Sequence, residues 1–226
     1  MRTLTSRLSP RSPARRQFLA PLVACAACLT LAPNAVAQQV QPLFELFATY
    51  GRPALPSSVA SAYAPAGGIR AGGGVGAAVG ALIGHVEIAG FYELGTASVA
   101  RRTVTDRPRD FTRSTAGLRV EVPLPELGRE FRGLVSGSLF VQELDTAYVA
   151  DAFTPTTVRA VAQRRAPGAR VEVGVEHRGF IGTTWFLTGG VVAAGAGSGS
   201  WETATDRRGG IGVAPIITLG LRTRQW

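Results

Sequence analysis

Lysine is absent from this chain, and all 24 of its basic residues are arginine. Cysteine is nearly absent, because the only two, Cys25 and Cys28, lie close to the N-terminus. If that segment is removed, the rest of the chain has no disulfide, thiolate metal site or cysteine nucleophile. Long apolar runs are also missing after the N-terminal segment, which excludes a membrane-spanning helix there.

The N-terminal segment has the three parts of a secretory signal. Five arginines precede Glu45, the first acidic residue, and an apolar run follows at Phe18–Leu31. Ala35-Val36-Ala37 then supplies an A-x-A cleavage site. The apolar run is too short for the roughly 20 residues that span a bilayer as a helix. We therefore predict a cleavable signal peptide at residues 1–37.

Two other export motifs overlap this segment. Arg15-Arg16-Gln17-Phe18-Leu19 resembles a twin-arginine signal, which directs folded proteins across the inner membrane. Leu22-Val23-Ala24-Cys25 resembles a lipoprotein box that would make Cys25 a lipidated N-terminus. The second interpretation shortens the apolar core of the signal to about half the usual length, so cleavage after Ala37 fits better.

The formal charge of +9 and the isoelectric point near 11.0 at first indicate a nucleic-acid partner. Removal of the five signal arginines leaves 19 basic against 15 acidic residues, which is a much smaller excess. Several arginines also lie beside glutamates, as in Arg119/Glu121 and Arg170/Glu172. Phosphate binding requires an unbalanced basic surface, so we expect no nucleic-acid partner.

Apolar residues alternate with polar or small residues along most of the remaining chain, which is the period of a β-strand. Val171, Val173 and Val175 alternate with charged residues and glycine. The glycines of 72–84 alternate in the same way with small aliphatic residues, which favours a strand over a glycine-zipper helix. A short apolar patch at 43–47 is followed by a stretch rich in Pro, Ser and Ala at 51–65, and we interpret residues 38–65 as an N-terminal extension or linker with at most one helical turn or a short strand. The alternation predicts an all-β domain at 66–226, an up-and-down antiparallel β-barrel of about eight strands.

Alternation alone does not show which face of the barrel contacts water. A soluble barrel places its apolar face inside, whereas a membrane barrel places it against lipid. The apolar face here is uniformly aliphatic, as in Leu118, Val120 and Val122, and the opposite face pairs arginine with glutamate. A narrow interior requires such pairing, because a buried charge needs a partner. We expect the following residues to lie in the lumen: Arg119, Glu121, Arg170, Glu172 and Glu176.

The C-terminal residues Thr218–Trp226 resemble the closing strand of bacterial outer-membrane β-barrel proteins, which ends in an aromatic residue. The resemblance implies a small eight-stranded barrel with Trp226 as its assembly signal. It also implies the outer membrane as location, outer-membrane lipid as surroundings and the barrel assembly machinery as a partner. Two features depart from the pattern: Leu219 and Leu221 are out of phase with Trp226, and Pro215 demands a local bulge.

Candidate chemistry is sparse. The two histidines lie beside glutamates, as His85-x-Glu87 and Glu176-His177, but their spacing fits no zinc signature. Glu172 and Glu176 would be about 13 Å apart on one strand face, wider than the glutamate pair of a glycosidase. We predict no catalytic, metal-binding or cofactor-binding residue.

The expected role is therefore that of an outer-membrane protein that is structural, adhesive or a narrow passive pore, and not an enzyme. The alternative is a soluble exported barrel that binds a small apolar ligand in the periplasm. The sequence does not indicate an oligomeric state.

Overall fold

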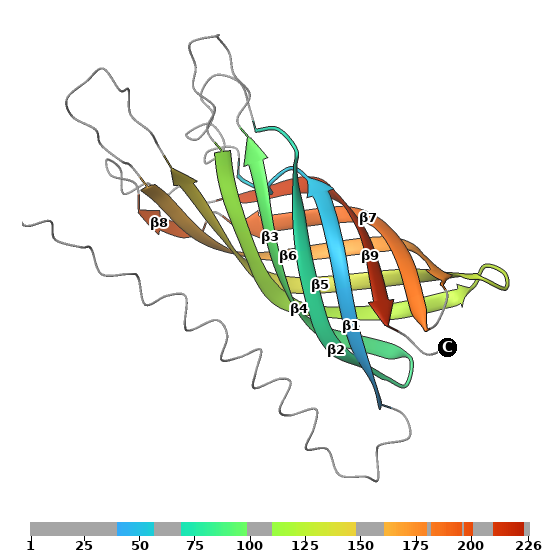
Figure 1. Cartoon of the computed structure of the whole chain (residues 1–226). Coiled ribbons are helices and arrows are strands. Elements are labelled where there is room, and N and C mark those ends of the chain that lie inside the picture. Colours follow the sequence, from blue (N-terminus) through green and yellow to red (C-terminus); the bar gives the residue numbers. More distant parts are fainter. Residues whose placement is uncertain are drawn as a thin grey trace, which may run out of the picture. The chain divides into compact units, whose positions relative to one another are not determined.

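The structure is a computed structural model that describes residues 40–56, 69–98, 110–147, 161–179, 182–195, 197–200 and 210–223. Strands make up almost all of these ranges (Figure 1). They are β1 (Val40–Gly51), β2 (Gly72–Ile83), β3 (Val86–Ser98), β4 (Asp110–Glu126), β5 (Phe131–Ala147), β6 (Val161–Arg178), β7 (Thr183–Gly195), β8 (Ser198–Ser200) and β9 (Ile211–Thr223). The predicted signal peptide, both cysteines and Trp226 lie outside the described residues.

Eight long strands close into a ring. Their order is β5-β4-β3-β2-β1-β9-β7-β6, and a further pairing of β5 with β6 completes the circle. Every pairing is antiparallel. The short strand β8 pairs only with the first part of β6. The prediction of an eight-stranded, up-and-down antiparallel barrel is therefore confirmed.

The ladder between the first long strand, β1, and the last, β9, is the shortest of the eight ladders that form the ring. It contains seven residue pairs, from Glu45↔Arg222 to Gly51↔Ile216. The ladder between β5 and β6 contains seventeen. The first strand of the chain is thus held to the last by fewer than half as many pairs as the longest ladder has.

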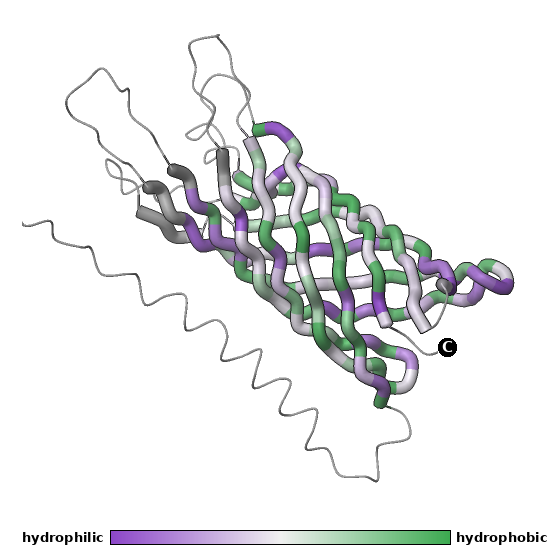
Figure 2. Tube along the Cα trace, in the orientation of Figure 1, coloured by the Kyte–Doolittle hydropathy of each residue, from purple (hydrophilic) through white to green (hydrophobic). Residues whose placement is uncertain are grey.

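Apolar side chains cover the outside of the barrel, and polar ones fill the inside. Along β6, the side chains of Val171, Val173 and Val175 are exposed, whereas Arg170 and Glu172 between them are buried. Figure 2 shows the same alternation of hydropathy along the strands. This is the reverse of a soluble barrel, so the alternative of an apolar ligand cavity is not favoured.

The barrel begins earlier than the sequence analysis predicted. We expected an extension at 38–65, but Val40–Gly51 is a full strand between β2 and β9. Its inward residues include Leu43 and Phe47, and its outward residues include Phe44 and Leu46. Because both faces carry apolar residues, the contrast between them is weak and the alternation was not recognised.

The glycine-rich segment forms strand β2, as predicted. Gly74, Gly76 and Gly80 face inward with Ala78, whereas Gly73 and Val75 face outward. The strand ends in a two-residue turn in which Gly84 has a φ of 61°, a conformation that favours glycine. The outward apolar residues change parity at this turn, between Ile83 and Ile88.

Pro215 does not produce the bulge that we expected. β9 runs without a register shift beside β7, with Pro215 opposite Val191. On its other side, the ladder with β1 begins only at Ile216. Pro215 therefore has a strand neighbour on one side only, and a proline is tolerated at such a position.

The two ends of the barrel differ in their connections. At one end, three turns of two, four and four residues join β2 to β3, β4 to β5 and β6 to β7. At the other end, the four connections have 20, 11, 13 and 15 residues, the last including β8. Short turns at one end and longer loops at the other are typical of outer-membrane barrels.

No helix in the described part of the chain has the length and apolar character required to cross a membrane.

Candidate functional site

The barrel interior is the candidate site, because it gathers the charged residues that the sequence analysis singled out. Each of the five predicted lumen residues has a buried side chain there, with 7% or less of its surface exposed. They lie on β4 and β6, at inward positions of the alternation. Trp226, the predicted assembly signal, lies outside the described residues.

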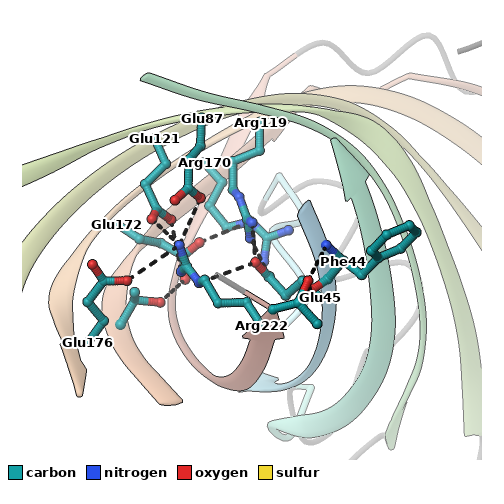
Figure 3. Close-up of polar contacts among 11 residues, drawn as sticks. Phe44, Glu45, Glu87, Arg119, Glu121, Arg170, Glu172, Glu176 and Arg222 are labelled. Carbon is teal, nitrogen blue, oxygen red and sulfur yellow. Dashed lines mark hydrogen bonds and ion pairs between the residues drawn. The ribbon is translucent and has the colours of Figure 1, made fainter. Parts of the chain in front are cut away.

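Arg222 of β9 is the centre of the ion-pair network (Figure 3). Its Nη1 donates to Glu87 Oε2 at 2.9 Å and also to the carboxylate of Glu121, which accepts a second bond from Nη2 at 3.2 Å. Glu45 lies 3.7 Å from its Nε, and Glu176 lies 3.8 Å from its Nη1. One arginine thus joins carboxylates from β1, β3, β4 and β6 across the lumen.

An aromatic ring supports the same guanidinium. The Cζ atom of Arg222 lies 4.3 Å from the centroid of the Phe186 ring. A cation over an aromatic face is favourable, and more so when water is excluded. The Arg222 side chain is fully buried, so its whole charge is compensated by protein groups.

Two more arginines complete this cluster. Arg119 donates to both oxygens of Glu45, with Nη1 at 2.7 Å from Oε1. Such two-point bonds between guanidinium and carboxylate are among the strongest that side chains make. Arg132 donates to Glu176 from Nε at 2.5 Å. Arg119 and Glu45 come from strands separated by β2 and β3, so the contact crosses the interior.

A second group of contacts lies nearer the long connections. Glu93 accepts bonds from Thr49 at 2.8 Å, from Arg113, and from Arg170 at 3.5 Å. Arg170 also lies 3.7 Å from Glu172.

Two threonines donate hydrogen bonds to Glu172, the other acid of this second group. Glu172 Oε1 accepts hydrogen bonds from Thr188 at 2.8 Å and from Thr218 at 2.6 Å. Glutamates and arginines are equal in number in the described interior, but the Arg222 cluster has one more glutamate than arginine and the second group, with Arg164, has one more arginine than glutamate. In total, six buried glutamates face four buried arginines and two partly exposed ones, Arg113 and Arg132.

Phenylalanines fill the lumen between the two charged groups, and glycines make room for them. Gly220 lies opposite Phe47 on one side and Phe186 on the other. Gly117 stands in the same way between Phe91 and Phe140. A Cβ added at Gly220 would lie 2.3 Å from the Phe186 ring, which is too close for any real contact.

The start of the first long connection folds into the other end of the lumen. Pro53, Ala54 and Pro56 are buried, and Ala54 belongs to the same apolar cluster as Ala214 of β9. The backbone of Leu55 would lie 2.1 Å from a Cβ at Gly212, so β9 can only carry glycine there. Residues 53–56 therefore cover the inner face of β9 at that end.

The five residues that the sequence analysis placed in the lumen are buried, but not all of them contact the neighbours that the sequence suggested. Arg170 does contact Glu172, its neighbour two residues on, yet Arg119 pairs with Glu45 and Glu121 pairs with Arg222. Glu45 and Arg222 were not recognised as lumen residues. Arg222 alternates with the outward Leu219 and Leu221 on the same strand, and this pattern could have identified it.

The two histidines lie at the short-turn end of the barrel. His85 is exposed in the turn after β2, whereas Glu87 points inward. His177 points outward, 3.3 Å from Glu130, and its ring lies 4.7 Å from that of Phe131. Within the described ranges, no three His, Cys, Asp or Glu side chains could hold a metal ion together.

The outer surface at this end carries aromatic residues. Phe131, His177 and Trp185 occupy one cross-strand row of β5, β6 and β7. Phe131 and Trp185 are about half exposed, at 47% and 50%. Aromatic residues at the ends of the apolar band are typical of membrane barrels, where they lie at the lipid–water interface.

Comparison with solved structures identifies similar barrels. The chain resembles Neisserial surface protein A with a TM-score of 0.53 and 12% sequence identity, over 82% of this chain and 99% of that one. It resembles a major outer membrane protein from Thermus thermophilus with a TM-score of 0.50 and 11% identity, over 81% and 99% of the two chains. No protein-family profile matches the chain, and no curated protein matches it. With its apolar exterior and charge-paired interior, the chain has the fold of the small eight-stranded barrels of bacterial outer membranes.

Proposed function

We propose that this protein resides in the bacterial outer membrane as a barrel with a sealed lumen. Its role is structural or adhesive, and it neither conducts ions nor catalyses a reaction. The observation that carries this proposal is the Arg222 network, in which one buried guanidinium contacts carboxylates from four strands across the interior.

The packing of the lumen argues against the narrow passive pore that the sequence left open. A conducting path needs water and mobile counter-ions along the lumen. Here Arg119 and Glu45 hold each other by two bonds, and Phe47 and Phe91 meet edge to face with centroids 6.4 Å apart. Pro53 and its neighbours pack inside the far end.

The same contacts argue against an enzyme. A general acid or base must reach the substrate proton, directly or through one water. The buried glutamates at the centre of the barrel instead accept bonds from arginine and threonine. The proposed role therefore belongs to the outer surface and to the longer connections. In outer-membrane barrels the longer connections face the outside of the cell.

The first test is the location and folded state of the protein. Membranes of expressing cells are separated, and the outer-membrane fraction is run on SDS gels with and without boiling. We expect a band in that fraction that shifts on boiling, because a folded barrel resists SDS until it is heated. Recovery from the periplasm in soluble form would disprove the membrane assignment.

The second test is conductance in planar lipid bilayers. We expect no steady current from the purified, folded protein. The comparison is the double variant Phe47→Ala with Phe186→Ala. It removes two phenyl rings from the lumen and so empties part of the layer between the two charged groups. A steady, ohmic current from the unmodified protein would show that the lumen is open.

A further inference from the structure

One buried arginine in the lumen lacks the partners that the others have. Arg164 of β6 is 4% exposed and points inward, like Ala166 and Arg170 on the same strand. Its Nε has no hydrogen-bond partner, and no ion pair joins it to an acid among the described residues. Arginine remains protonated in proteins, so its full charge is present in the interior.

Among the described residues, the inward neighbours of Arg164 include further hydrogen-bond donors. Arg164 and Arg113 flank Leu144 in one cross-strand row. The two arginine backbones are thus about 10 Å apart, two strand spacings, which is within reach of two long side chains. In the next row Gln142 is 2% exposed, and its Nε2 also has no partner.

Glu93, the inward acid that contacts this group in the described part of the chain, already has several partners. Glu93 serves both Arg113 and Arg170, and Thr49 donates to it as well. Arg164 therefore adds a positive charge that this group does not compensate. A buried charge without a partner is costly, so a counter-charge is required at this position.

We propose that Arg164, Arg113 and Gln142 form an oxyanion-binding site in the lumen, at the end where the long connections lie. The ligand class is a phosphate or sulfate group. The planar guanidinium fork matches the oxygens of such a group with two parallel bonds, and the Gln142 amide supplies a further N–H. This site is separate from the Arg222 network and does not depend on the proposed sealed lumen.

The test uses the full barrel, purified and folded in a neutral detergent. Its unfolding temperature is measured from the heat-induced shift on gels, in chloride, phosphate, sulfate or acetate at one ionic strength. We expect phosphate and sulfate to raise the unfolding temperature in a saturable way, and chloride and acetate to have little effect. Binding of radioactive phosphate gives the affinity directly.

Two variants locate the site. Arg164→Gln should weaken phosphate binding at least about tenfold, because the charge-assisted hydrogen bonds that the guanidinium donates are lost. Arg165→Gln is the matched control, because the neighbouring Arg165 points outward, is 51% exposed and pairs with Glu143. It should bind phosphate like the unmodified protein.

The behaviour in chloride distinguishes a ligand from a hidden protein partner. Without an oxyanion, Arg164→Gln should unfold at the same or a higher temperature than the unmodified protein, because it removes an uncompensated charge. If Arg164→Gln unfolds earlier in chloride, the chain itself supplies the counter-charge and the proposal is wrong. It is equally wrong if phosphate and sulfate stabilise both variants alike.

A competition experiment identifies the source of the group. A sulfated disaccharide that displaces phosphate would show that the site accepts an anion carried on a sugar. Displacement by free sulfate alone would assign the site to a small inorganic anion.

Discussion

Glu87 and Glu121 lie directly opposite each other on β3 and β4, and the Nη1 of Arg222 contacts both carboxylates. Like charges directly opposite in a sheet repel each other. The position is tolerated because the last strand supplies a cation between them. Stability of these two strands therefore depends on a residue that lies outside their own ladder.

Replacement of Arg222 by alanine should be strongly destabilising. The change leaves Glu87 and Glu121 buried without their shared partner, and such a loss costs about 3–5 kcal/mol. Urea unfolding of the barrel in lipid vesicles measures the free energy. Arg178→Ala is the control, since Arg178 is exposed at the end of β6. Equal midpoints for the two variants would contradict the network described above.

Replacement of Gly220 by alanine should reduce stability by about 1–3 kcal/mol, as overpacking of a dense interior does. The added Cβ would meet the Phe186 ring at 2.3 Å. A second change, Phe186→Leu, should restore part of the loss by removing the ring. Gly137→Ala is the matched control, because a Cβ at Gly137 would have nothing within 4 Å. The prediction fails if both alanine variants unfold at the same urea concentration.

Two adjacent residues of β6 face opposite environments, so a polar substitution should destabilise the barrel at one of them and an apolar substitution at the other. Val173→Arg places a charge on the lipid face and should cost about 2–4 kcal/mol near the bilayer midplane. Glu172→Leu should also destabilise, because Thr188 and Thr218 lose their acceptor. His85→Arg, in an exposed turn, is the control and should be neutral. If Glu172→Leu folds as well as this control, the interior is not the packed polar lumen that we describe.

The resemblance of the C-terminus to a closing strand predicts a role for Trp226 in assembly. Trp226→Ala should lower the amount of heat-modifiable protein in the outer membrane, and Trp226→Phe should restore most of it. Refolding of the purified variants into detergent separates assembly from stability. A defect of Trp226→Ala in that refolding as well would assign Trp226 to the stability of the barrel instead.

Local pattern was enough to predict the strands but not the contacts between them. The alternation at Val171, Val173 and Val175 predicts both the strand and its outward face, because side-chain direction has a period of two in any strand. The partner of Arg119 could not be predicted in the same way. Glu121, two residues away, faces the same side, but the closed ring brings Glu45 from a distant strand within reach.

The first strand shows a different limit. Val40–Gly51 alternates as regularly as the other strands, but the contrast is between one apolar residue and another at Leu43, Phe44, Leu46 and Phe47. An analysis of sequence pattern detects a strand by the alternation of polar and apolar residues. The inward layer of the barrel around Phe47 consists of phenylalanine side chains, so this alternation is weak there. In the sequence, the glycines opposite those rings indicated only a strand face made of small residues. Their function is to make room for a ring on the neighbouring strand, and this cannot be predicted until the pairing of the strands is known.

The position of Arg222 on the final strand ties charge balance to the order of synthesis. The cluster around it holds four carboxylates, from Glu45, Glu87, Glu121 and Glu176, and otherwise only the two cations of Arg119 and Arg132. A ribosome makes all six of these groups before Arg222, which lowers the surplus of negative charge in the cluster from two to one. Until β9 joins β1, the incomplete barrel carries the larger surplus of negative charge in this cluster, so closing the ring and halving that surplus are one event.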